Sequence, residues 1–403
     1  MINKTPNESI AYAAAEDNFL SGKLREATQI CNRILADQPG NPDALHLLGG
    51  IALRMGNPFR AAELIQKSIE LRPGDANAHM NLGRALYQQG KLEEAVCSYR
   101  KAIKIQHNLA DARKLLESTR SEIKRLDETV RSLDKSAQGP SIRFSHEEKK
   151  KRIPDPETLN RAARLYRHFG YLIIEDLFSE QFVSELYDDF ESEYSRYFAD
   201  KAFDDALQVG DKRIMVTLKL QGPFNNPEYY TNPLLMPLLA RLLGRDFILF
   251  SLGAVVSLPG AQLQRTHRDH RPLFEGEDLG ETLPSCAITL GIPLIEMNDV
   301  NGTTRVYGKT HRNQGELSEK DRKNGISPII RKGSCILFDY QLFHEGTPNS
   351  SRNVRPLMYN IYSRPWFHDC QNYSKQAPMV IPDGEFAKIP EAHRHLFMRT
   401  RQA

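Results

Sequence analysis

Two histidines and one aspartate in the C-terminal half of the chain have the residue types and spacing that suit a metal ion. His267 and Asp269 are separated by one residue, so both side chains point to the same face of an extended segment. His344 follows the apolar run 334–343, which we expect to be a strand. Two imidazoles and one carboxylate suit non-haem Fe(II) and leave positions open for oxygen chemistry. We therefore predict that His267, Asp269 and His344 form a catalytic iron site.

Arg355 is the candidate for binding a co-substrate beside this metal. It follows His344 at the start of the next expected strand, 355–363. A guanidinium group presents a rigid fork that pairs with a carboxylate, and 2-oxoglutarate offers such a carboxylate while its other end chelates the metal. We predict that Arg355 binds 2-oxoglutarate. Gln264 and Thr347 lie near the ligands in sequence, and we place them in the cofactor-binding set as hydrogen-bonding groups around the ligands.

Each of these residues also has an ordinary structural explanation. His267 and Asp269 could form a hydrogen-bonded surface pair, and His344 could be a histidine of the core. Arg355 could be a surface arginine in a salt bridge. The order of the four residues along the chain favours the site, because a single His-x-Asp pair is common by chance.

Four other basic residues are expected to be structural or solvent-exposed. His270 has the opposite parity to His267 and therefore points elsewhere. His311 follows a turn of the chain, and Arg213 and Lys219 belong to an expected strand at 213–221. Arg213 and Lys219 have binding of the co-substrate or the substrate as the alternative role, but we assign none of the four to the site.

The elements that must position these residues are mostly strands. Short runs rich in β-branched and aromatic residues alternate with Gly, Pro, Asn and Asp, which predicts a β sandwich or barrel of the jelly-roll type. Expected strands are 170–174, 213–221, 247–257, 286–293, 334–343 and 355–363, with helices at 156–169 and 179–194.

The C-terminal region resembles the phytanoyl-CoA dioxygenase family of Fe(II)- and 2-oxoglutarate-dependent oxygenases over about 165–367. The resemblance rests on an entry strand at 168–176, on a Gln-x-x-His-x-Asp segment at 264–269, and on an Asn-Gly turn that leads to His311. It implies a double-stranded β-helix fold, the same three iron ligands, and 2-oxoglutarate held by Arg355. Two features depart from the family: 307–311 lacks the usual proline and serine, and Arg268 stands where a polar or aromatic residue is often found.

The N-terminal region contains an internal repeat with a period of about 34 residues. Glycines and alanines recur at this spacing, namely Gly22, Gly56 and Gly90, and Ala27, Ala61 and Ala95. The segments 8–41, 42–75 and 76–109 resemble tetratricopeptide repeats (TPR), which are stacked helical hairpins, and 110–126 would cap the stack. We therefore predict two domains, an all-α TPR solenoid at 8–120 and a jelly-roll oxygenase domain at 155–403, joined by a helical and charged linker at 121–154.

Composition restricts the location and the partners. The chain has 403 residues, 40% of them hydrophobic and 26% charged, with a formal net charge of +3. This balance does not favour a nucleic-acid partner. No apolar run is long enough to cross a membrane, so we expect a cytoplasmic protein without a membrane anchor. The five cysteines form no CxxC pair, which argues against a disulfide framework.

These patterns predict a 2-oxoglutarate-dependent dioxygenase whose default reaction is hydroxylation. Asp269 occupies the position that related halogenases leave open for chloride, so halogenation is not expected. The substrate is a small molecule, or an acyl group tethered to a carrier or a protein that the repeats deliver. The repeats would bind a protein partner or a second copy of the chain. The alternative is a TPR scaffold protein whose oxygenase-like domain is catalytically idle.

Overall fold

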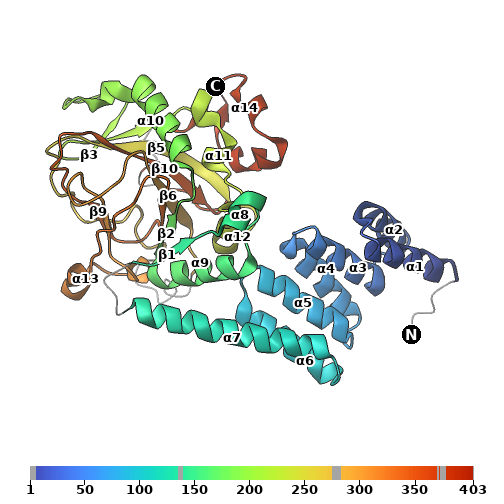
Figure 1. Ribbon diagram of the computed structural model, residues 1–403. Coiled ribbons are helices and arrows are strands. Elements are labelled where there is room, and N and C mark those ends of the chain that lie inside the picture. Colours follow the sequence, from blue (N-terminus) through green and yellow to red (C-terminus); the bar gives the residue numbers. More distant parts are fainter. Residues whose placement is uncertain (1–5, 135–138, 275–282, 370–371, 373–377, 403) are drawn as a thin grey trace. The chain divides into compact units, whose positions relative to one another are not determined.

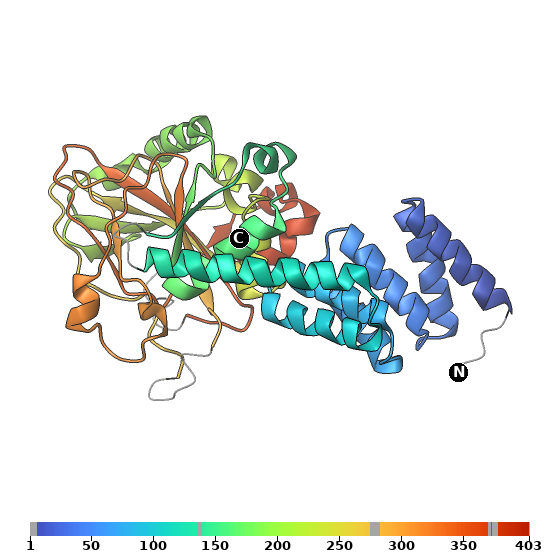
Figure 2. The same ribbon diagram turned by 60° about the horizontal axis from the view of Figure 1, so that its bottom comes forward.

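The computed structural model describes residues 6–134, 139–274, 283–369, 372 and 378–402, and it divides the chain into two compact units, Met1–Thr129 and Val130–Ala403. Figures 1 and 2 show a helical N-terminal unit and a C-terminal unit built around strands. This is the predicted combination of a helical repeat array and a jelly-roll domain. None of the helices in the described part of the chain is long and apolar enough to span a membrane.

The N-terminal unit consists of helical hairpins. Its helices are α1 (Pro6–Leu20), α2 (Leu24–Asp37), α3 (Pro42–Arg54), α4 (Pro58–Leu71), α5 (Ala76–Gln88), α6 (Leu92–Ile105) and α7 (Ala110–Leu133), the last of which continues into the second unit. Gly22, Gly56 and Gly90 form the turns inside the hairpins with φ of +79°, +74° and +75°. Only glycine adopts this left-handed conformation without strain, which explains the periodic glycines.

Close approach of paired helices explains two further glycines. A Cβ atom added to Gly49 would lie 2.4 Å from Cγ1 of Ile65, and one added to Gly83 would lie 2.4 Å from Cε1 of Tyr99. The hairpins therefore pack at a distance that no larger residue permits at these positions. Asn41 and Asp75 begin the following helices by accepting hydrogen bonds from the backbone N–H groups of Ala44 and Ala78.

The C-terminal unit contains one large and two small sheets. The large sheet has the order β1-β2-β8-β6-β10-β5-β4-β3, and the small sheets pair β7 with β9 and β11 with β12. The strands are β1 (Ser141–Arg143), β2 (Tyr171–Glu175), β3 (Leu207–Gly210), β4 (Arg213–Thr217), β5 (Ile248–Ser257), β6 (Ala287–Pro293), β7 (Thr304–Val306), β8 (Cys335–Asp339), β9 (His344–Gly346), β10 (Arg355–Ser363), β11 (Val380–Ile381) and β12 (Arg401–Gln402).

Helices cover one face of the large sheet. The helices of this unit are α8 (His146–Lys151), α9 (Pro156–Phe169), α10 (Glu180–Tyr194), α11 (Pro227–Tyr230), α12 (Met236–Leu243), α13 (Glu319–Lys323) and α14 (Glu385–Lys388). Helix α9 ends at Gly170, whose φ is +77°. The core joins side chains of α9, α10 and α12 to alternate residues of the strands, such as Leu252 of β5 and Met358 of β10.

The other residues of the same strands face a cavity, because successive side chains of a strand point to opposite faces. Arg355, Leu357, Tyr359 and Ile361 of β10 line this cavity, whereas Met358 packs in the core between the sheet and the helices. The sheet thus carries an apolar core on one face and the candidate site on the other.

The predicted linker at 121–154 differs from the structure. Helix α7 extends to Leu133, and Ser141 pairs with Ile173 so that β1 adds a parallel edge strand to the large sheet. Phe144 is 1% exposed in the core, and Ser145 begins α8 with a capping box. The segment around β1 and α8 is therefore part of the C-terminal unit. A three-residue strand and a charged six-residue helix carry too little periodicity to be visible in the sequence.

The described cysteines agree with the prediction that the chain has no disulfide framework. Cys31, Cys97, Cys286 and Cys335 are free thiols, and all but Cys97 are buried. Cys370 lies outside the described residues.

Candidate metal centre

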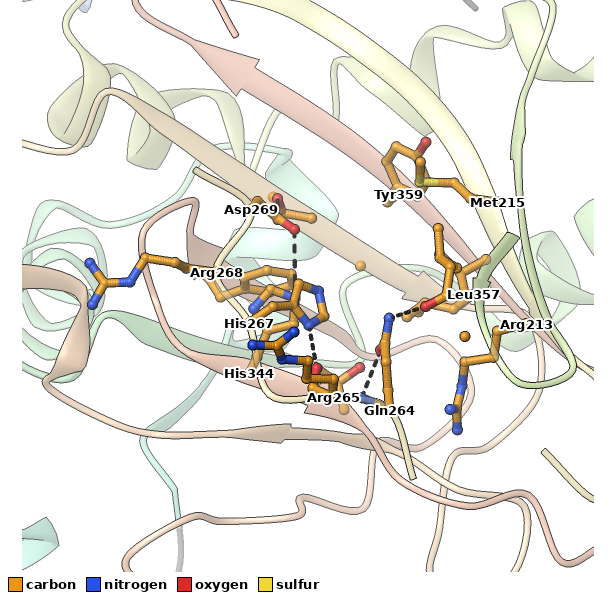
Figure 3. Close-up of a pocket in the computed structure, with 18 of the residues that line it drawn as sticks. Arg213, Met215, Gln264, Arg265, His267, Arg268, Asp269, His344, Leu357 and Tyr359 are labelled. Carbon is orange, nitrogen blue, oxygen red and sulfur yellow. Dashed lines mark hydrogen bonds and ion pairs between the residues drawn. The ribbon is translucent and has the colours of Figure 1, made fainter. Parts of the chain in front are cut away.

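The structure brings His267, Asp269 and His344 together in the wall of the cavity (Figure 3). Their candidate ligand atoms all lie within 4.8 Å of one another. The two imidazole centroids are 4.4 Å apart, and Nε2 of His344 lies 3.7 Å from Oδ1 of Asp269. One ion can therefore contact one atom of each residue.

A backbone bridge holds the two segments that carry these residues. The N–H of His267 donates to the carbonyl of His344 over 3.0 Å, and the N–H of His344 donates back over 2.8 Å. The predicted strand 334–343 is wrong in one respect, because β8 ends at Asp339 and His344 begins the separate strand β9 in a small sheet. The chain reverses between them, so His344 reaches the site from the second sheet of the jelly roll.

Hydrogen bonds to the backbone fix the tautomer of both imidazoles. Nδ1 of His267 lies 2.9 Å from the carbonyl oxygen of Arg265, and Nδ1 of His344 lies 3.0 Å from that of Leu342. A carbonyl oxygen only accepts, so each Nδ1 carries a hydrogen, and in the neutral ring each Nε2 then has the lone pair that a metal needs. Burial, with a smaller effect of His344, lowers the pKa of His267 and favours the neutral ring that a metal requires.

Asp269 is oriented by side chains that lie far away in the sequence. Thr289 donates to its Oδ2 over 3.4 Å, and Asn372 donates to its backbone oxygen over 2.9 Å. Asn372 also donates to the buried carboxylate of Asp369, which accepts a bond from Tyr340. Sequence reasoning missed this network, because Asn372 and Asp369 are distant from Asp269 and belong to no motif.

The cavity beside the triad has a volume of about 480 Å³. Much of its wall is apolar, with Leu207, Val209, Met215, Val255, Leu263, Phe338, Leu357, Tyr359 and Ile361 among the lining residues. Arg213, Gln264 and Arg355 also line it. The space is large enough for 2-oxoglutarate together with part of a second molecule.

Arg355 is a buried charge without a carboxylate partner among the described residues. It is 2% exposed, Nη1 lies 3.0 Å from the sulfur of Met297, and Nε has no hydrogen-bond partner in the described part of the chain. Burial, assisted by the nearby Arg213, lowers the pKa of Arg355 to about 9, so it still carries its charge at neutral pH. An isolated buried cation is costly, and an anionic ligand would offset that cost.

Arg213 is a second buried cation at the cavity, and the sequence prediction passed over it. It is 1% exposed and donates to the carbonyl oxygens of Gln262, over 2.6 Å, and Thr347. Arg213 and Arg355 both pair with Ser257 of β5, one from each side, which places the two cations in one row across the sheet. The burial of Arg213 follows from the pairing of β4 with β5, for which the sequence offers no local signal. Lys219 follows β4 and does not line the cavity.

The structure separates the two other members of the predicted cofactor-binding set. Gln264 lines the cavity, donates to the carbonyl of Val209 over 2.8 Å, and accepts from the N–H of Gly346 over 3.0 Å. Thr347 is buried outside the cavity lining, and its hydroxyl accepts from the N–H of Thr303 over 2.6 Å. The hydroxyl of Thr347 thus anchors the turn after Gly302, and its place in the cofactor-binding set stays a prediction.

His270 and His311 lie away from the triad, as predicted. The His270 ring packs edge to face on Phe367, with centroids 5.2 Å apart. His311 is buried against Gly170, where an added Cβ would lie 2.4 Å from its Nδ1. Both rings serve packing.

Comparison with known families agrees with this geometry. Residues 166–357 match the family model described as phytanoyl-CoA dioxygenase (PhyH). The C-terminal unit carries a PhyH domain. This match confirms the predicted class of enzyme, a 2-oxoglutarate-dependent non-haem iron dioxygenase, with Fe(II) and 2-oxoglutarate as its cofactors. Two imidazoles whose Nδ1 atoms are held by carbonyl oxygens, a carboxylate, and a buried arginine without a carboxylate partner in the described part of the chain fit these groups.

The repeat region matches a family model as well. Residues 20–102 match the model described as anaphase-promoting complex, cyclosome, subunit 3, which agrees with the predicted TPR array. Protein O-mannosyl-transferase TMTC1 of Homo sapiens is 29% identical over 107 residues, which are 26% of this chain and 12% of that protein.

One curated relative and two solved structures are similar to part of the chain. Dioxygenase trt7 of Aspergillus terreus is 25% identical over 214 residues, which are 51% of this chain and 73% of that protein. The structure of EvdMO1 is similar with a TM-score of 0.42 at 19% identity, over 51% of this chain and half (50%) of that one. The epimerase SnoN, in complex with Fe3+, alpha ketoglutarate and nogalamycin RO, is similar with a TM-score of 0.41 at 17% identity, over 52% and 85%.

Proposed function

We propose that the PhyH domain oxidises its substrate at an Fe(II) ion held by His267, Asp269 and His344. The observation that carries this proposal is the convergence of three ligand atoms beside a cavity that also contains an unpaired, buried arginine. Arg355 binds the distal carboxylate of 2-oxoglutarate, and Gln264 holds the segment that leads to the ligands. Hydroxylation is the default outcome, and Asp269 argues against halogenation because it keeps the carboxylate that a halogenase would lack.

The residues of this chain provide binding, orientation and exclusion of water. Iron, 2-oxoglutarate and dioxygen together supply the oxidising power for an unreactive C–H bond. Both imidazoles present lone pairs in one fixed direction, and Thr289 and Asn372 hold Asp269. Arg355 then selects one orientation of the co-substrate, because a planar guanidinium fork binds a carboxylate in a defined plane.

We further propose that the substrate presents an apolar group to the metal. Met215, Leu357 and Tyr359 form one side of the cavity (Figure 3). Asp211 lines the cavity and interacts with Arg213, whereas Arg355 has no carboxylate partner among the described residues, so we assign Arg355 to 2-oxoglutarate. The substrate is then a small molecule or a carrier-tethered group with an aliphatic or aromatic reacting end.

The direct test is consumption of 2-oxoglutarate by the purified full-length protein. Added Fe(II) should stimulate the release of succinate, slowly without substrate and faster with one. A screen of compounds with apolar ends, scored by coupled succinate release, would then identify the substrate. If the wild-type protein binds neither Fe(II) nor 2-oxoglutarate, the result would favour the alternative function as a scaffold protein.

We propose that the repeats bring a substrate carrier or another protein partner to the enzyme, with self-association as the alternative. TPR arrays expose a large concave surface that commonly binds peptides or proteins. A variant lacking residues 1–129 should keep β1 and the whole second unit. It should bind iron and 2-oxoglutarate normally but oxidise the true substrate about a hundredfold more slowly at low substrate concentration, because tethering no longer raises the effective concentration.

The matched control is a variant lacking residues 1–143, which also removes β1. Loss of this strand exposes the edge of β2, so the control should unfold at a lower temperature than the first variant. Equal turnover by the full-length protein and the variant lacking 1–129 would exclude delivery and leave self-association or localisation as the role of the repeats. An insoluble first variant would show that the repeats stabilise the enzyme.

A further inference from the structure

Arg268 stands between two of the three proposed iron ligands, and its side chain is anchored on the protein. Nη1 donates to the carbonyl oxygen of Asn313 over 2.9 Å, and Nη2 donates to that of Gly315 over 2.8 Å. The guanidinium carbon lies 3.9 Å from the ring centroid of Phe343. Figure 3 shows the side chain extending away from Asp269, so its cationic end is committed to the protein.

These contacts connect the segments that carry all three ligands. Arg268 is adjacent to His267 and Asp269 in the chain, and Phe343 is adjacent to His344. Phe343 is itself fixed, because its N–H donates to the hydroxyl of Thr310 over 3.1 Å. The side chain of Arg268 therefore connects the His267–Asp269 segment to the segment of His344. The backbone bridge between the two histidines is a second connection.

The energetics favour a fixed arrangement. Arg268 is half-buried, and taking a charge partly out of water is costly. Two charge-assisted hydrogen bonds to carbonyl oxygens and the face of an aromatic ring offset this cost. Arginine satisfies all three contacts at once because its guanidinium is planar and has several donors, whereas lysine has a point charge on a flexible stem.

We propose that Arg268 is a positioning residue that sets the geometry and affinity of the metal site through Phe343 and the 313–315 segment. This inference rests on the proposed function, since it assumes that His267, Asp269 and His344 bind the metal. Residues that orient metal ligands commonly contribute tenfold to a hundredfold to metal affinity. Arg268 is not one of the three proposed ligands and acts on the metal site through its contacts with the protein.

The experiment measures metal binding directly. The metal-free wild-type protein and its Arg268→Met and Arg268→Lys variants are titrated anaerobically with Co(II), whose visible absorption spectrum reports ligand geometry. Arg268→Met should bind about tenfold to a hundredfold more weakly, with a changed spectrum, and Arg268→Lys should be intermediate. Arg352→Met is the matched control, because it removes an exposed arginine of the same unit and should leave the affinity for Co(II) unchanged.

A double-mutant cycle with Phe343→Leu tests the route of the effect. Phe343→Leu alone should weaken Co(II) binding, and the double variant with Arg268→Met should bind no more weakly than Arg268→Met, because both changes break the same contact. If Arg268→Met fails to fold, as judged by melting of the metal-free protein, Arg268→Lys and Phe343→Leu decide the question.

The outcomes separate this inference from the proposed function. Wild-type protein that binds neither Co(II) nor Fe(II) would overturn the proposed function and this inference with it. Wild-type binding together with unchanged affinity and spectrum in the Arg268 and Phe343 variants would overturn the positioning role alone. Weakened binding in these variants, with normal binding by Arg352→Met, would establish it.

Discussion

Replacing His344 with alanine should abolish 2-oxoglutarate turnover and the binding of Fe(II). The change removes one of the three ligand atoms, and the remaining two cannot hold the ion against water while they bind a chelating co-substrate. His267→Ala should behave in the same way. The measurement is the charge-transfer absorption that forms when Fe(II) and 2-oxoglutarate are added without oxygen, followed by the rate of succinate release in air.

The control for these variants is His395→Ala, which removes an exposed imidazole of the same unit. It should show the wild-type absorption band and the wild-type rate. The metal-free His344→Ala protein should remain folded, because Nδ1 of His344 bonds only a carbonyl oxygen of its own segment. Normal absorption and turnover in both histidine variants would show that the iron site has been placed wrongly.

Replacing Arg355 with glutamine should weaken 2-oxoglutarate binding at least about tenfold while Fe(II) binding stays near normal. Truncating one partner of a buried, hydrogen-bonded charge pair costs roughly 2 to 5 kcal/mol, and each 1.4 kcal/mol corresponds to about a factor of ten. The affinity is measured by titrating the anaerobic Fe(II) protein with 2-oxoglutarate. Arg352→Gln is the matched control, since it removes the charge of an exposed arginine just before β10.

The stability of the same variant gives an independent result. The folded protein lowers the pKa of Arg355 to about 9 from its ordinary value, so at neutral pH the folded state bears a cost for its charge. Removing that charge should leave the melting temperature of the ligand-free protein unchanged or raised. Added 2-oxoglutarate should raise the melting temperature of the wild type but not of Arg355→Gln. A variant that loses stability yet binds 2-oxoglutarate normally would make Arg355 a structural residue.

Local patterns explain why much of this protein was visible in the sequence. Each hairpin of the N-terminal unit needs a glycine in its turn, and these glycines are Gly22, Gly56 and Gly90. The need arises within a single hairpin, so it recurs in the sequence with the period of the repeat. The His-x-Asp segment was equally accessible, since residues two apart in an extended chain face the same side. The helix at 156–169 and the strand at 355–363 were predicted with the limits that the structure has.

The errors arose where a residue depends on distant parts of the chain. The apolar run 334–343 suggested one strand, but the turn after Asp339 moves His344 into another sheet. Arg213 is buried because β4 pairs with β5, and no local pattern in the sequence predicts that pairing. Residues that hold the ligands are supplied by the tertiary fold, and a single sequence contains little information about them.

The hydrogen bonds of the two imidazoles have a consequence for protein engineering. Each Nδ1 donates to the carbonyl oxygen of the residue two positions earlier, Arg265 or Leu342. Every amino acid has that carbonyl, so replacing either side chain leaves the acceptor where it is. The hydrogen bond that orients each imidazole therefore does not depend on which side chain occupies position 265 or 342. Libraries that vary the apolar wall at Met215, Leu357 and Tyr359 can therefore search for new substrates without disturbing how the histidines present their lone pairs.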